Sequence, residues 1–152
     1  MTGVWVVLAV LALGTGIGVV RLRRDGRMRD RAGDRLTADV LGVPLGPRAT
    51  LVQFSTAFCQ PCRATRRILA DVSALVPGVA HVEIDAESRL DLVRELDILR
   101  TPTVLVLGPS GDIVKRASGQ PRKADVLSAL AIAVPPGETP SGTPSSQESD
   151  EM

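Results

Sequence analysis

The sequence predicts an α/β fold, a three-layer α/β/α sandwich with a mixed central sheet, preceded by one N-terminal transmembrane helix. From Ala49 to Val134, short apolar runs alternate with runs whose apolar residues recur every three to four positions. The resulting order is β-α-β-α-β-β-α. Residues 1–20 form a separate apolar run without a charged side chain.

Residues 1–20 are long enough to cross a membrane, because a 20-residue helix spans about 30 Å, the thickness of the hydrocarbon core. A cleaved signal peptide and a buried core helix are the alternatives; the first lacks a basic side chain before the apolar run, and the second rarely is apolar all round. The next segment, "RLRRDGRMRDR", carries six arginines. Such a flank favours the cytoplasmic side and can contact lipid head groups. We therefore expect a single-pass cell-membrane protein whose catalytic domain faces the cytoplasm.

Residues 21–48 are predicted to be a basic juxtamembrane segment and linker, with one short helix at Thr37–Leu41. The run "ATLVQF" at 49–54 predicts a buried strand. A helix is expected from Cys59 to Val76, since its apolar residues keep helical spacing until Pro77 and Gly78 end it.

The later elements complete a domain expected at 49–134. They are a strand at 79–85, a helix from about 88 that ends before Arg100, a strand at 103–107, a turn at 108–112, a returning strand at 112–118 and a last helix that includes 126–134. Two βαβ crossovers predict parallel strands, and the hairpin predicts an antiparallel edge. Residues 135–152, an acidic Pro/Ser-rich tail, are expected to be disordered.

Composition argues against a nucleic-acid-binding protein. Lys and Arg number 18 against 17 Asp and Glu, and the aromatic residues are only Trp5, Phe54 and Phe58. The arginine run alone is a weaker basis for DNA or RNA binding than for a membrane flank. No nucleic-acid partner is expected.

The two cysteines, Cys59 and Cys62, form a Cys-x-x-Cys pair for which three functions can be weighed. Structural zinc needs four ligands, and only His81 could join the pair, so no metal is expected. An inert buried pair is possible, because free cysteines often serve as small apolar residues. A redox pair is favoured by its position between a predicted strand and helix.

The predicted helix start also favours a Cys59 thiolate. Pro61 fits the first helical turn, where the backbone N–H groups have no partners and create a positive end. Arg63, Arg66 and Arg67 add positive charge in the next turn. A thiolate is the nucleophile in thiol–disulfide exchange.

From about Ala49 to Val134 the sequence resembles thioredoxin and its membrane-tethered relatives. The matching stretches are "LVQFSTAFCQPCR", "VEIDAES" and "RTPTVLVLGPSGDIV", followed by Gly119. The resemblance implies a thioredoxin-like sandwich in which Cys59 is the nucleophile, Cys62 resolves the mixed disulfide, and the two form a redox-active disulfide. It also implies a cis Pro102 that faces the cysteines and a Thr101 whose backbone pairs with substrate.

Four positions depart from the family pattern. Phe58 replaces a Trp and Gln60 a Gly around the first cysteine; both are candidate substrate-binding residues. Gln53 stands where the family has a buried acid, and an amide cannot accept a proton at neutral pH. His81 stands where the family commonly has a lysine, so we hypothesise that it handles part of the proton transfer. A polar strand residue without a chemical role is the alternative.

These observations predict a membrane-anchored thiol–disulfide oxidoreductase that reduces protein disulfides, since the cytoplasm is kept reducing. Expected partners are disulfide-containing proteins, an unidentified electron donor and the lipid bilayer through residues 1–20, and no cofactor is implied. Two alternatives stay open. One is an outward-facing reductase for exported or cytochrome-maturation substrates, and the other is a redox-inactive binding module.

Overall fold

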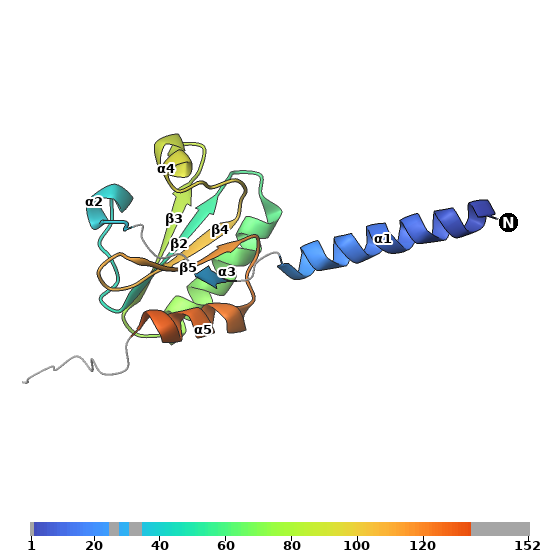
Figure 1. Ribbon diagram of the computed structural model, residues 1–152. Coiled ribbons are helices and arrows are strands. Elements are labelled where there is room, and N and C mark those ends of the chain that lie inside the picture. Colours follow the sequence, from blue (N-terminus) through green and yellow to red (C-terminus); the bar gives the residue numbers. More distant parts are fainter. Residues whose placement is uncertain (1, 25–27, 31–34, 135–152) are drawn as a thin grey trace, which may run out of the picture.

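The computed structural model describes residues 2–24, 28–30 and 35–134 and confirms the predicted α/β sandwich (Figure 1). The helices are α1 (Thr2–Arg24), α2 (Ala38–Leu41), α3 (Gln60–Leu75), α4 (Leu90–Glu95) and α5 (Lys123–Ala133). The strands are β1 (Arg29–Asp30), β2 (Ala49–Ser55), β3 (Val79–Asp85), β4 (Thr103–Leu107) and β5 (Ile113–Ser118). They form one mixed sheet in the order β1-β5-β4-β2-β3.

The second predicted βαβ crossover, from β3 through α4 to β4, is wrong: β4 was expected to run parallel to the other strands. β2 and β3 are parallel, but β4 runs antiparallel to β2. α4 has six residues and spans only about 9 Å, whereas a seven-residue strand spans about 23 Å. The helix therefore cannot return the chain along the strand, and β4 enters the sheet where β2 ends, with Thr103 opposite Phe54.

Two apolar clusters cover the two faces of the sheet. α3 and α5 pack on one face, around Leu51, Leu69, Val104 and Val126. The other face is covered by residues of α2, α4 and the adjoining segments, including Leu41, Leu92 and Leu96. β2 lies between them and is buried along its whole length, so it gives the site at its end a rigid base.

The strand β1 was not predicted. Arg29 and Asp30 pair antiparallel with Arg116 and Lys115 of β5, which makes β1, and not β5, the edge of the sheet. Its two polar residues have no apolar pattern that could predict a strand. The short helix expected at Thr37–Leu41 is present as α2, with the Thr37 hydroxyl accepting from the Val40 N–H.

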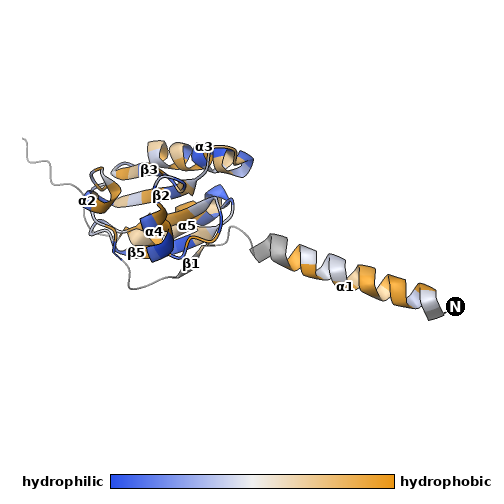
Figure 2. Cartoon of the chain, turned by 90° about the horizontal axis from the view of Figure 1, so that it is seen from above, coloured by the Kyte–Doolittle hydropathy of each residue, from blue (hydrophilic) through white to orange (hydrophobic). Residues whose placement is uncertain are grey.

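The helix α1 continues past residue 20 through Arg24, and between Gly3 and Val20 it exposes an apolar surface (Figure 2). Its window Gly3–Val20 is long and apolar enough to cross a membrane, and none of it is buried. Length and composition alone do not separate such a span from a signal sequence. The expected tail at 135–152 and part of the arginine run lie outside the described residues.

Candidate active site at the Cys59–Cys62 pair

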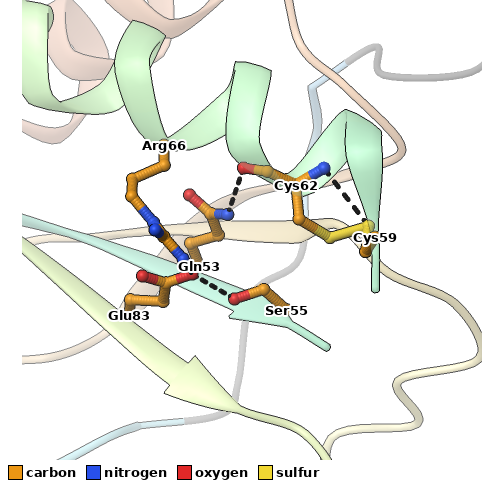
Figure 3. Close-up of polar contacts among 6 residues, drawn as sticks. All are labelled: Gln53, Ser55, Cys59, Cys62, Arg66 and Glu83. Atoms are coloured by element: carbon orange, nitrogen blue, oxygen red, sulfur yellow. Dashed lines mark hydrogen bonds and ion pairs between the residues drawn. A yellow bond between two sulfur atoms is a disulfide. The ribbon is translucent and has the colours of Figure 1, made fainter. Parts of the chain in front are cut away.

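The two cysteines lie where β2 gives way to α3, and they are joined in a disulfide with sulfurs 2.03 Å apart (Figure 3). Cys59 is the N-cap of α3, and Pro61 occupies its first turn. Cys62, one turn further, is buried with 1% of its surface exposed, whereas Cys59 is partly exposed. Of the pair, Cys59 is therefore the sulfur that another molecule can reach.

The start of α3 can stabilise negative charge on Cys59. The N–H of Cys62 donates to the Cys59 sulfur over 3.2 Å, and the helix N-terminus adds a partial positive charge. Arg66, which we expected to support the thiolate, instead pairs with Glu83 at 2.6 Å. That contact neutralises much of its charge, so the helix N–H groups carry more of the effect.

Gln53 is fully buried beneath the helix start. Its Nε2 donates to the carbonyl oxygen of Cys62 over 2.9 Å. Its Oε1 is also buried and has no hydrogen-bond partner within the part of the chain that the structure describes. The amide thus fastens the first turn of α3 to β2 but offers no group that titrates near neutral pH.

Glu83 lies next to Gln53, because β2 and β3 pair in parallel with these two residues opposite each other. Its Oε1 accepts from the Arg66 guanidinium and from the Ser55 hydroxyl. Partial burial raises the pKa of Glu83, but these hydrogen bonds and the charge of Arg66 outweigh it, so the pKa lies below its ordinary value. At neutral pH the side chain is a carboxylate.

A pocket of about 510 Å³ opens beside the disulfide. It is lined by Ser55, Thr56, Ala57, Cys59, Cys62, Arg63, Arg66, Glu83 and Asp85. Sequence reasoning missed Glu83 and Ser55 as site residues. Alternation along β2 places Ser55 on the same face as Gln53, but only the register between β2 and β3 brings Glu83 to that face, beside Gln53.

His81 lies two residues before Glu83 on the same strand, and it is not among the residues that line the pocket. It is half-buried, and burial lowers its pKa, against the attraction of Glu83. Its Nε2 has no hydrogen-bond partner in the described segments. The imidazole is thus neutral at pH 7, and its role in proton handling stays a prediction.

The Thr101–Pro102 peptide bond is cis. The Gly119 N–H donates to the Pro102 carbonyl oxygen over 2.7 Å, with Gly119 at a φ of 96°, a value that favours glycine. The hydroxyls of Thr101 and Thr56 lie 3.3 Å apart, which connects this turn to the segment before the cysteines.

The surface around Cys59 is open and contains a large apolar side chain. Phe58, which directly precedes Cys59, is 97% exposed. Gln60 is exposed as well, on the first turn of α3. No group of three or more His, Cys, Asp or Glu side chains that could hold a metal occurs among the residues described.

The thioredoxin family model matches residues 44–132, more than half of the chain. Thioredoxin from Mycolicibacterium smegmatis is 29% identical over 104 residues, 66% of this chain and 89% of that protein. Thioredoxin H5 from rice (Oryza sativa subsp. japonica) is 28% identical over 72 residues, 47% of this chain and about half (53%) of the rice protein. The crystal structure of thioredoxin NaTrxh from Nicotiana alata has a TM-score of 0.52 at 24% identity, covering 59% of this chain and 76% of that one.

Proposed function

This chain belongs to the thioredoxin family, and from that premise we propose that it is a membrane-anchored enzyme whose Cys59–Cys62 dithiol reduces disulfides in proteins. Thioredoxin-family oxidoreductase chemistry follows from the family and the cysteine pair. The single observation that carries the proposal is the difference between the two sulfurs: Cys59 is accessible at the helix N-terminus, and Cys62 is buried beside it.

The proposed reaction has two exchange steps. The Cys59 thiolate attacks one sulfur of a substrate disulfide, which forms a mixed disulfide and releases the other substrate sulfur as a thiolate. Cys62 then loses its proton and attacks the Cys59 sulfur. The bond between Cys59 and the substrate breaks, the substrate leaves as a second thiolate, and the enzyme is left with its internal disulfide. Two electrons pass to the substrate, and a donor must return them.

The substrate would lie across the surface formed by Phe58, Gln60, Thr101 and Pro102. Phe58 is almost fully exposed beside the nucleophile and offers apolar contact. The hydroxyl contact between Thr56 and Thr101 supports a fixed position of the cis turn near the cysteines. An extended peptide could pair with the backbone of Thr101, as edge-strand recognition requires.

The helix α1 is proposed to anchor the enzyme in the cell membrane, with the catalytic domain in the cytoplasm. The apolar window Gly3–Val20 supports the span, and the arginines that follow it support the orientation. A tether raises the local concentration of the dithiol near substrates at the membrane surface.

The test is reduction of insulin disulfides by the full chain in detergent with dithiothreitol as electron donor. We expect catalysis by the native chain and none by Cys59→Ser. Reduced Cys62→Ser, freed of dithiothreitol and then mixed with insulin, should accumulate a mixed disulfide, visible as a larger species on a non-reducing gel. If the native chain does not accelerate the reaction over dithiothreitol alone, the proposed enzymatic activity is refuted.

The second candidate, a redox-inactive binding module, is favoured by Gln53 in place of an acid. The reduction potential of the pair separates the two. A reduction potential of about −270 mV, as for thioredoxin, supports a cytoplasmic reductant, and a potential of about −120 mV indicates an oxidant. A pair that forms no disulfide in a glutathione buffer leaves only the binding module.

A further inference from the structure

The second exchange step requires a proton acceptor for Cys62, and Gln53 cannot be one. A buried thiol has an ordinary or raised pKa, so little thiolate forms at neutral pH without a base. Gln53 contacts the Cys62 backbone but offers an amide. The nearest strand neighbour of Gln53 on β3 is a carboxylate, Glu83.

We propose that Glu83 accepts the proton of Cys62 through water in the pocket beside the disulfide. Glu83, on β3, would thus perform the proton transfer that an acid at position 53, on β2, would otherwise perform. This inference rests on the proposed reductase function. Cys62 and Glu83 line the same pocket. Its volume of about 510 Å³ holds several water molecules, each of which occupies about 30 Å³ in the liquid.

The contacts of Glu83 fix the carboxylate in place. Ser55 from β2 and Arg66 from α3 both donate to its Oε1 (Figure 3). Both of these bonds use Oε1, which leaves Oε2 available to water. The Ser55 hydroxyl also lines the pocket, and its lone pairs can accept from a water while it donates to Glu83.

The proton follows a balanced route. The Cys62 thiol gives its proton to water, the water gives one to Glu83, and the Cys62 thiolate attacks the Cys59 sulfur. The neutral carboxylic acid then returns the proton to solvent through the open pocket. Besides Glu83, the charged groups that line the pocket are Arg63 and Arg66 of α3 and Asp85 of β3. His81 of β3 does not line it but interacts electrostatically with Glu83 and Arg66, and Gln53 and Ser55 of β2 carry no charge.

A purely electrostatic effect of Glu83 would have the opposite sign. A carboxylate near Cys62 disfavours its thiolate, and neutralising it would also free Arg66 to stabilise that thiolate. Removing the charge would then accelerate the second step. If Glu83 is instead a proton acceptor, its neutralisation makes the second step slower.

The experiment uses 5,5′-dithiobis(2-nitrobenzoate) with the full, reduced chain in detergent. The first nitrothiobenzoate released reports attack by Cys59, and the second reports resolution by Cys62. For Glu83→Gln we expect the second release at pH 6 to slow by about 10²-fold, the lower end of general-base effects. The deficit should shrink as pH rises past the ordinary thiol pKa of about 8.5, where thiolate forms without help.

Two further variants make the test specific. Asp85→Asn removes the same charge from the same pocket, but one of its oxygens is bound to the Glu87 N–H. Its second release should stay within about threefold of native, because Asp85 is exposed and solvent screens its charge. Glu83→Asp should recover part of the rate, since water can bridge the extra distance. It also serves as the test if Glu83→Gln does not fold.

Three results would overturn the proposal. They are an unchanged or faster second release in Glu83→Gln, a deficit that is equal at all pH values, and a larger loss in Asp85→Asn than in Glu83→Gln. If the native chain gives no second release, the reductase function itself falls. If it gives both releases and Glu83→Gln matches it, only the role of Glu83 falls.

Discussion

The side-chain amide of Gln53 and the backbone carbonyl of Cys62 are joined by a 2.9 Å hydrogen bond in a fully buried position. The bond requires the nitrogen of the amide to face the helix, since the alternative would set two oxygens against each other. β2 and the first turn of α3 are therefore held together at the buried cysteine. Gln53 therefore has a structural role at a position where the family has an acid that takes part in proton transfer.

Gln53→Glu should destabilise the chain in a pH-dependent way. A carboxylate there would lose the donor to Cys62 and be buried facing a carbonyl oxygen, so its pKa should rise. A raised folded-state pKa means that stability is retained below the unfolded value and lost as pH rises. We expect a cost of about 1–3 kcal/mol at pH 8 and less at pH 4, by urea unfolding of the oxidised chain.

Circular dichroism is the appropriate signal for this experiment, since the chain's one tryptophan, Trp5, lies in α1 and not in the sheet. Gln120→Glu at an exposed position makes the same chemical change and should leave stability close to native. An equal loss in both variants would contradict the role assigned to Gln53.

Arg66→Met should make the chain less stable at neutral pH. Hydrogen bonding and charge from Arg66 help to keep the pKa of Glu83 low, and such a carboxylate stabilises the fold above its unfolded pKa. The difference from native should therefore disappear as pH falls through the pKa of Glu83. It should also shrink in about 1 M salt, because the pair is partly exposed. Thermal unfolding midpoints measured across pH provide the test, with the exposed Arg67→Met as the control.

His81→Ala should leave the pH dependence of the second release unchanged, because the ring does not line the pocket. Its stability should nevertheless respond to acid. Burial lowers the pKa of His81, so the native chain loses stability as pH falls through the unfolded value of about 6.5. The alanine variant should lose less between pH 7 and pH 5. A release profile that shifts with this variant would give His81 the proton-handling role hypothesised from the sequence.

Deletion of residues 2–24 should release the protein from membranes. The native chain should stay in the membrane pellet after alkaline carbonate extraction, since a span of this length resists such treatment. The shortened chain should appear in the supernatant and still reduce insulin. Recovery of a native chain that is itself shortened at the N-terminus would instead indicate a cleaved signal sequence.

Local sequence patterns were sufficient to predict β2, α3, β3 and β4, because each is either a nearly continuous apolar run or strongly periodic. β2 is buried along its whole length and mostly apolar, and α3 keeps helical spacing nearly to Pro77. The Cys-x-x-Cys pair was visible for the same reason, since both cysteines lie on one helical turn. The helix predicted from about Ser88 to before Arg100 is too long; α4 spans Leu90–Glu95, and Asp97 has a positive φ of 49°.

Only the tertiary structure decided the direction of β4, the edge strand β1 and the surroundings of Cys62. The first depends on how far a six-residue helix can carry the chain, and the second on pairing between residues far apart in sequence. The third depends on register: Glu83 lies beside Gln53 because their strands pair in parallel, and Arg66 reaches it from a helix above. The sequence by itself determined which residues carry the thiol chemistry, because that chemistry resides in two local side chains. Which group can take their proton is a property of contacts between strands and helix, which no local pattern records.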